Sequence, residues 1–381
     1  MTETNTIHRT DVLVIGAGQA GLSAGYHLQR QGIDYRIVEA DQRVGDVWRR
    51  RYDSLTLYSP AGWDALPGMR FPLPKRQFPT GQQMGEYLGS YADHFGLQVD
   101  TGVRVERLDA PNAEGEPFVV TAADRRYEAG RVIVTTGAFQ SPKIPAFAAE
   151  LDPSIRQIHA GDYRNPSQLA DGPVLVVGLS HSGSDLAHEI SASRQVTVSG
   201  RAHGQLPFSL NSRRGRLGWP ILAWVFSHVM TLRTPLGRKM APEVRKDGGP
   251  LLRWRKPDLL ARGIELVEAR TTGVRDGKPM LADGRVLDVA NVVWCTGFGR
   301  DYSWINPAIE LDENGWPVQY RGVTSTPGLY FSGVIFQYSF TSMLVHGAGR
   351  DAEYVVDHIA ERMDVRKPAA GGVRATAAEQ S

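Results

Sequence analysis

The sequence predicts an α/β fold in which one chain holds two repeated βαβ units, the second inserted into the first. Residues 11–39 and residues 173–199 both run through an apolar strand, a glycine-rich turn, a helix and a second strand. Two further apolar strands, within 132–139 and 292–299, each enter a glycine turn, and we expect them to be the two crossings between the units. A chain of 381 residues is long enough for two domains.

The first unit has three glycines at the spacing of a dinucleotide-binding turn. Gly16 permits the tight turn, Gly18 lets the backbone approach a pyrophosphate, and Gly21 lets helix and strand pack closely. The N-terminus of the helix offers free N–H groups and a positive dipole end to that pyrophosphate. Glu39 ends the second strand, close to the spacing of about 20 residues expected of the acid that binds ribose hydroxyls. The expected bounds are a strand at 12–15, a helix at 19–31 and a strand at 34–38.

The second unit repeats this turn with Gly178, Ser180 and Gly183, so a serine replaces the middle glycine. A serine costs little there if its φ is negative, although the loop must then lie slightly further from a phosphate. The second strand ends without an acid and is followed by Arg201, so we expect nothing there to repel a phosphate. An acid favours a free ribose hydroxyl, whereas a guanidinium favours a 2′-phosphate. The first unit therefore suits FAD or NAD, and the second suits NADP.

Periodicity predicts most of the remaining elements. Helical spacing indicates helices at 81–95 and from about 346 to 363. Alternation indicates β-meanders at 98–136 and at 263–287, the latter with a hairpin turn at Asp283-Gly284.

Two segments allow more than one interpretation. The aromatic and apolar residues of loop 43–60 could pack over a flat heterocycle, or the loop could simply contain a core tryptophan. Within residues 205–257, an apolar helix from Trp219 to Met230 is flanked by basic residues. A helix packed in the second domain, a cover over a substrate entrance and a helix on a membrane surface are the alternatives.

Composition excludes several classes of protein. A formal charge of +2 gives no reason to expect binding to nucleic acid or to an acidic membrane. Cys295 is the only cysteine, so the chain can form no internal disulfide, thiolate metal cluster or CxxC redox pair. The sequence shows neither a signal-peptide pattern nor an apolar run long enough to span a bilayer, and we expect a cytoplasmic location. The tail at 367–381 is expected to be disordered.

Taken together, these motifs resemble the class B flavin-dependent monooxygenases. This is the flavin-containing monooxygenase family, in the small form found in plant auxin-pathway enzymes and bacterial homologues. The two glycine turns correspond to the family's FAD and NADPH motifs. Residues 45–48 resemble its Gly-Gly-x-Trp motif, with Asp46 at the second glycine, and residues 295–298 resemble its Ala-Thr-Gly-Tyr motif.

One family motif is incomplete. The fingerprint FxGxxxHxxx(Y/F) keeps His159 and Tyr163, but Pro153 and Ile155 stand at its Phe and Gly positions. This departure puts the geometry of NADP retention in question. Considered alone, His159 would be read as a surface histidine.

The resemblance implies two Rossmann-like dinucleotide-binding domains, with one FAD and one NADPH. We expect the FAD-binding domain to cover residues 1–145 and 291–366, and the NADPH-binding domain to cover residues 146–290. We assign no residue to catalysis or to a metal. The residues expected to bind the cofactors are Gly16, Gly18, Gln19, Ala20, Gly21, Glu39, Ala40, Gly45, Val47, Trp48, Gly137, Gly178, Ser180, Ser182, Gly183, Arg201, His203, Thr296, Gly297 and Gly333.

In this family NADPH reduces the flavin, and O2 then adds to give a flavin 4a-hydroperoxide. One oxygen atom passes to a nitrogen, a sulfur, a ketone or a keto acid. The resemblance implies the same reaction here, on a small organic substrate whose identity is left open. The cofactor does the chemistry, which fits the lack of a catalytic triad or paired carboxylates in the sequence.

Other functions remain open. A flavin oxidoreductase or NADPH oxidase without oxygen transfer is one alternative, and a non-catalytic flavin-binding protein is another. A disulfide reductase such as thioredoxin reductase would need a CxxC pair, which the sequence lacks. The assembly state is also open, a homodimer being one alternative.

Overall fold

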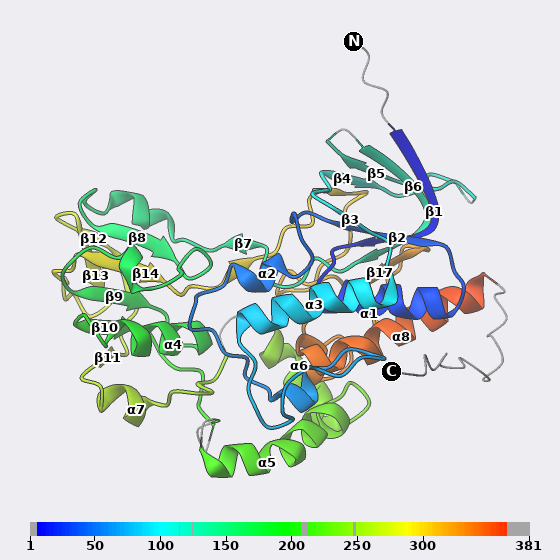
Figure 1. Cartoon of the computed structure of the whole chain (residues 1–381). Helices are drawn as coiled ribbons and strands as arrows, with labels where there is room; N and C mark the ends of the chain where they lie inside the picture. The colour runs from blue at the N-terminus through cyan, green and yellow to red at the C-terminus, as the bar shows by residue number, and fades with distance from the viewer. Residues whose placement is uncertain are drawn as a thin grey trace, which may run out of the picture.

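Two parallel sheets form the frame of the molecule, as the sequence predicts. The computed structural model describes residues 6–363 except 114, 124, 207–209, 211 and 247–248, so the tail at 367–381 lies outside the described residues. In Figure 1 the strands of the first sheet, from blue β1 and β2 through teal β5 and β6 to orange β17, lie apart from the green and yellow strands of the second. This topology confirms the predicted fold class: a first α/β unit with a second inserted into it.

The first sheet has eight strands within the described residues, in the order β16-β4-β5-β6-β1-β2-β3, with β17 also paired to β6. β1 is parallel to β2 and β6, and β17 is parallel to the end of β6. Their bounds are β1 Thr6–Ile15, β2 Tyr35–Glu39, β3 Val99–Thr101, β4 Arg107–Asp109, β5 Phe118–Ala122, β6 Arg125–Val134, β16 Ile305–Asn306 and β17 Leu329–Phe331.

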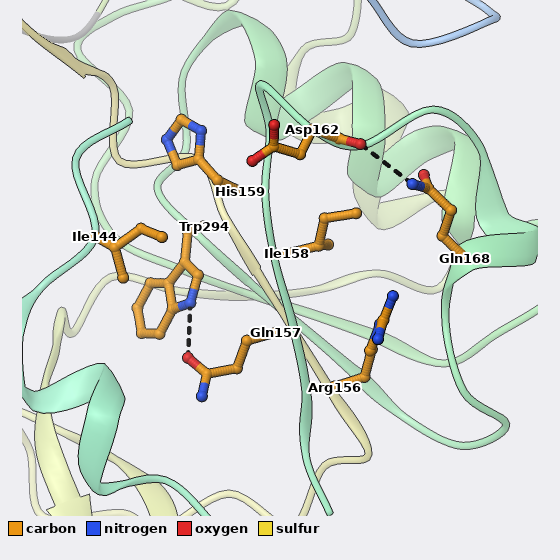
Figure 2. A pocket seen from close by; sticks show the side chains of 8 residues that line it. All are labelled: Ile144, Arg156, Gln157, Ile158, His159, Asp162, Gln168 and Trp294. Carbon is orange, nitrogen blue, oxygen red and sulfur yellow. Dashed lines mark hydrogen bonds between the residues drawn. The ribbon is translucent and has the colours of Figure 1, made fainter. Parts of the chain in front are cut away.

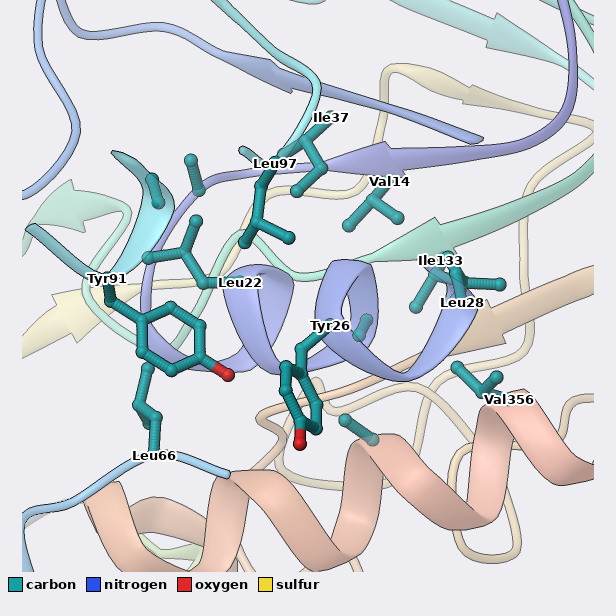
Figure 3. Close-up of a cluster of buried hydrophobic side chains, with 14 of the residues drawn as sticks. Val14, Leu22, Tyr26, Leu28, Ile37, Leu66, Tyr91, Leu97, Ile133 and Val356 are labelled. Carbon is teal, nitrogen blue, oxygen red and sulfur yellow. The ribbon is translucent and has the colours of Figure 1, made fainter. Parts of the chain in front are cut away.

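Helices α1, α3 and α8 cover one face of this sheet. Figure 3 shows α1 between the strands and α8, with Leu22 and Leu28 buried between them. A capping box begins α3: Thr80 Oγ1 accepts the N–H of Gln83, and the Gln83 side chain accepts the N–H of Thr80. The helices of this unit are α1 Gln19–Arg30, α2 Asp46–Arg49, α3 Gly81–Phe95 and α8 Val345–Arg362.

The second sheet has the order β11-β10-β9-β14-β8, and each neighbouring pair is parallel. Its strands are β8 Arg156–His159, β9 Val174–Val177, β10 Val196–Ser199, β11 Glu265–Val267 and β14 Asn291–Trp294. The hairpin β12 Thr271–Arg275 and β13 Lys278–Leu281 lies beside it, and the helices are α4 His181–Ile190, α5 Arg213–Trp224, α6 Pro235–Arg245 and α7 Lys256–Leu260. Helix α5 is continued by a π-helix over Val225–Val229.

The two crossings between the units lie against each other. β7 Ser141–Pro142 follows the first strand–glycine segment, β15 Phe298–Gly299 ends the second, and the two pair as an antiparallel ribbon. However, β14 belongs to the second sheet, so the chain returns to the first unit after Trp294, later than the expected boundary at residue 291.

Both predicted meanders are wrong in part. β3 does not join its successor; it extends the parallel part of the first sheet by pairing with β2. Likewise β11 is parallel to β10, whereas β12 and β13 form a hairpin that turns at Asp276 and Gly277, which both have positive φ. The hairpin turn predicted at Asp283-Gly284 is confirmed: Met280 forms an antiparallel bridge with Val286, and the N–H of Leu281 donates to the carbonyl oxygen of Arg285 at 2.8 Å.

Candidate functional site

The first glycine turn is closed by contacts within the backbone. Gly16 has φ +110°, and a Cβ there would lie 2.9 Å from the carbonyl oxygen of Thr135. A Cβ on Gly21 would lie 1.9 Å from the carbonyl oxygen of Gly16. Protein packing therefore demands both glycines. Gly18 differs, because its φ is −76° and no atom lies within 4 Å of a Cβ built on it. A glycine there is not required by the protein, which fits the close approach of a ligand.

Glu39 is held against this turn. One carboxylate oxygen accepts the N–H of Ala17 at 2.6 Å, and the other accepts the N–H of Asp41 at 3.0 Å. Ala40 lies between Glu39 and Asp41 in the sequence. The acid at the end of β2 is thus fixed beside the backbone of the glycine turn, where a dinucleotide would present its ribose.

The segment 45–48 forms the short helix α2 beside the same turn. Gly45 has φ +88°, and a Cβ there would lie 2.2 Å from the carbonyl oxygen of Gly85 on α3. The indole N–H of Trp48 donates to the side-chain oxygen of Gln19 at 3.4 Å. From the C-terminal part, Gly333 follows β17, and its Cβ would lie 2.9 Å from that of Ala20. The structure thus brings four predicted regions together: the turn with its Gln19, then Glu39, Trp48 and Gly333.

The second turn repeats the first in its backbone contacts. Gly178 has φ +105°, and a Cβ there would lie 2.4 Å from the carbonyl oxygen of Cys295. A Cβ on Gly183 would lie 1.9 Å from the carbonyl oxygen of Gly178. Ser180 has φ −131°, so the serine adopts its backbone conformation without strain, and Ser182 follows in the first turn of α4.

Charged side chains from other parts of the chain lie beside the end of β10. The Arg201 side chain is 76% exposed, and its Nε lies 4.0 Å from a carboxylate oxygen of Glu268. Lys256 Nζ lies 3.3 Å from the other oxygen of Glu268. The expectation that nothing there would repel a phosphate is therefore wrong, because the neighbouring strand β11 brings an acid to Arg201. His203 is exposed nearby in sequence.

The other predicted residues belong to the crossings. Gly137 and Gly297 have positive φ of +72° and +83°. The Thr296 hydroxyl donates to the carbonyl oxygen of Lys143, which ties one crossing to the other. These residues lie where the chain passes between the units rather than in either glycine turn.

His159 is buried, so its interpretation as a surface residue is wrong. It is 2% exposed; its Nδ1 accepts the N–H of Gly161 at 3.0 Å, and its Nε2 lies 3.0 Å from the Gly297 carbonyl oxygen. With Nδ1 accepting, Nε2 carries the proton and donates. Burial lowers the pKa of His159. The ring also meets Phe298 edge-on, with centroids 5.0 Å apart. This histidine therefore fastens β8 to the second crossing.

A shallow cavity of about 310 Å³ lies along the edge strand β8 (Figure 2). Trp294 forms part of its wall and donates to the Gln157 side chain at 3.1 Å. None of the predicted cofactor-binding residues lines it, so the cavity is separate from both glycine turns. Its lining residues are Ile144, Arg156, Gln157, Ile158, His159, Asp162, Gln168 and Trp294.

A buried polar cluster joins the two units, and sequence reasoning missed it. One oxygen of Asp185, on α4, accepts the hydroxyls of Tyr52 at 3.0 Å and Tyr58 at 2.9 Å and lies 3.4 Å from the Arg253 guanidinium. Arg253 also donates to the carbonyl oxygens of residues 56 and 57, both at 2.9 Å. Burial raises the pKa of Asp185, although Arg253 opposes this shift. The only signal of this cluster in the sequence is Asp185, an acid on the side of α4 that is buried.

Several buried polar atoms around this cluster have no hydrogen-bond partner. They include the second oxygen of Asp185, the indole N–H of Trp219 and Nε2 of His181. The His181 ring lies 5.4 Å from that of Tyr58, and Trp219 belongs to the same apolar cluster as Tyr58 and Trp63. Unpaired polar atoms are rare in protein interiors and indicate a place for a ligand or water.

Asp64, which is close in sequence to Tyr58, is a second buried carboxyl, and its protonation can be tested. It is fully buried and accepts the Ser59 hydroxyl at 2.5 Å, and burial raises its pKa to about 8. Because the folded-state pKa lies above the ordinary value of 3.8, its contribution to stability is complete below pH 3.8 and is lost as pH rises to about 8.

We therefore expect Asp64→Asn to flatten the pH dependence of stability. Between about pH 5 and 7.5, the free energy of unfolding of the wild type should fall by about 1.4 kcal/mol per pH unit relative to the variant. Urea denaturation at a series of pH values measures this. Asp171→Asn, at a fully exposed carboxylate, should keep the wild-type slope. Equal slopes for wild type and Asp64→Asn would contradict the buried, protonated carboxyl.

Among the described residues, none of the helices could span a bilayer, and no three His, Cys, Asp or Glu side chains gather closely enough to hold a metal ion.

The chain resembles known oxidoreductases over nearly its whole length. The family model described as pyridine nucleotide-disulphide oxidoreductase matches residues 13–211. An uncharacterized CzcO-like oxidoreductase of Geobacillus kaustophilus is 38% identical over 92% of this chain and 99% of that one. The probable indole-3-pyruvate monooxygenase YUCCA7 of Arabidopsis thaliana is 28% identical over 91% of this chain and 87% of its own length.

Solved structures agree. The flavin-containing monooxygenase from Stenotrophomonas maltophilia matches with a TM-score of 0.71 and 25% identity, over 93% of this chain and 99% of that one. A single cysteine leaves no CxxC pair for disulfide chemistry. The chain therefore belongs to the pyridine nucleotide-disulphide oxidoreductase family and, within it, to the class B flavin-dependent monooxygenases.

Proposed function

We propose that the protein uses NADPH and O2 to transfer one oxygen atom to a small organic substrate, with FAD on the first unit and NADPH on the second. The observation that carries this proposal is the pair of glycine turns with the same backbone contacts but different charges beside them. Glu39 stands at the first turn and Arg201 at the second. Two different dinucleotides fit this arrangement better than two copies of one.

The residues of the chain would bind and orient the cofactors. The turn from Gly16 to Gly21 and the N-terminus of α1 would hold the FAD pyrophosphate, and Glu39 would accept the ribose hydroxyls. The N-terminus of α4 would hold the NADPH pyrophosphate, with Arg201 on the 2′-phosphate. When bound, the flavin supplies the redox chemistry, since it accepts a hydride from NADPH and activates O2.

The substrate would bind beside the buried polar cluster. The aromatic side chains of Tyr58, Trp63, Phe78 and Trp219 belong to one apolar cluster there, which would exclude water from the substrate. The unpaired atoms of Asp185, Trp219 and His181 offer a small number of hydrogen bonds within it. This lining favours a substrate with an apolar body and one or two polar groups. Oxidation at nitrogen or sulfur, or of a ketone or keto acid, is the proposed chemistry.

The fate of NADPH tests the reaction. With amines, sulfides, ketones and keto acids offered in turn, NADPH consumption should be matched by an oxygenated product that contains one atom from ¹⁸O2. If all the NADPH consumed appears as hydrogen peroxide with every compound, the protein is an NADPH oxidase and oxygen transfer is wrong.

The first glycine turn supplies a matched pair of variants. Gly18→Val adds a side chain where no protein atom lies within 4 Å, so the fold should survive while the pyrophosphate is displaced and the protein purifies colourless. Gly21→Ala should instead lower the melting temperature, because its Cβ would meet the Gly16 carbonyl oxygen. Flavin absorbance and thermal unfolding separate the two effects. A Gly18→Val protein with a full complement of flavin would refute the assignment.

Arg201 should determine the preference for NADPH. A charge-assisted hydrogen bond contributes about 1.5 to 3 kcal/mol, so Arg201→Ala should raise the KM for NADPH by about one to two orders of magnitude. The KM for NADH should hardly change, since NADH lacks the phosphate. Glu268→Gln should lower the KM for NADPH, because it removes the acid that competes for Arg201. An equal loss for both nucleotides after Arg201→Ala would show that Arg201 only holds the loop.

A further inference from the structure

Helix α5 carries three large apolar side chains that face solvent. Leu217, Ile221 and Trp224 are 62%, 71% and 56% exposed. Their spacing of four and then three residues places them on one side of the helix. His228, about one turn further, stacks on Trp224 with ring centroids 5.4 Å apart. We call Leu217, Ile221 and Trp224 the α5 ridge. Figure 1 shows α5 at the lower edge of the molecule, away from both sheets.

The fold itself does not need these side chains. The opposite side of α5 supplies Trp219 and Ala223, which are 4% and 1% exposed and pack with Leu210. Helix α5 therefore meets its core contacts without the ridge. Exposed apolar residues are ordinary when they are scattered, but a continuous row marks an interaction surface.

The sequence that contains the ridge is basic. Residues 212–246 contain eight Arg or Lys and one acid, Glu243, although Arg245 is half-buried and lies 3.6 Å from Asp312. Glu243 is paired with Lys246 at 2.7 Å. In the first turn of α6, Leu236 is 47% exposed, and Arg238 and Lys239 beside it are exposed as well. An apolar row with a tryptophan, flanked by cations, is typical of helices that lie in the headgroup region of a bilayer.

We propose that the α5 ridge and the exposed basic residues Arg233, Arg238 and Lys239 dock onto the surface of an anionic lipid bilayer without crossing it. Anionic headgroups would attract the basic segment, and the acyl chains would cover the ridge. The competing occupant is a second copy of the chain. A two-fold dimer would bring each basic segment against its own copy, and the like charges would repel. The charge of this segment therefore favours lipid.

Vesicle flotation of the purified protein tests the proposal. The wild type should float with phosphatidylcholine vesicles that contain phosphatidylglycerol, should float poorly with phosphatidylcholine alone, and should be released by high salt. The variants Ile221→Ser/Trp224→Ser and Arg238→Glu/Lys239→Glu should each weaken partition by about tenfold or more. Leu260→Ser on α7, where the side chain is 57% exposed, should float like the wild type.

Unchanged melting temperatures would show that the variants fold, since all the replaced side chains are exposed. Failure of the wild type to float with phosphatidylglycerol vesicles would overturn the proposal. Equal flotation of wild type and Ile221→Ser/Trp224→Ser would overturn it as well. If that variant instead converts a dimer into a monomer in size-exclusion chromatography and the wild type ignores vesicles, the ridge binds a second copy of the chain.

Discussion

At one point in each nucleotide-binding unit, strand and helix approach so closely that only glycine fits. A Cβ on Gly21 or on Gly183 would lie 1.9 Å from the carbonyl oxygen of the first glycine in its turn. This approach holds the N-terminus of each helix against the end of its strand. The N–H groups of the turn are then presented at fixed positions by the backbone, before any side chain contributes. The two cofactor sites proposed here depend on that contact.

Two separate sets of side-chain contacts join the two nucleotide-binding units. On one side, His159 and Phe298 fasten the second sheet to the crossings. On the other, Asp185 and Arg253 contact Tyr52, Tyr58 and the backbone of the loop after α2. Removing one partner of a buried ion pair costs several kcal/mol, since the other charge is left unpaired. These contacts therefore resist separation of the two units.

Sequence reasoning located the elements whose signals are local. The glycine spacing predicted α1 to within a residue, and helical periodicity predicted both ends of α3. It failed where the outcome depends on which strands become neighbours. β3 and β11 each join a parallel sheet through partners distant in the chain, which no local alternation encodes. The pairing of β10 with β11 brings Glu268 to Arg201, and the pairing of β8 with β14 places His159 in the second sheet. The errors at the site therefore concern residues whose surroundings depend on strand pairing.

The ribbon of β7 and β15 has a consequence for how such a chain could arise. Phe298 pairs with Pro142, so the inserted unit leaves and re-enters the first unit at nearly the same point. β17 then pairs with β6 beside β1, completing the first sheet after the interruption. A second nucleotide-binding module could therefore be spliced into a surface connection of an existing one without rebuilding its core. Because both ends of the inserted unit meet at the β7–β15 ribbon, the whole unit is suited to exchange between related enzymes.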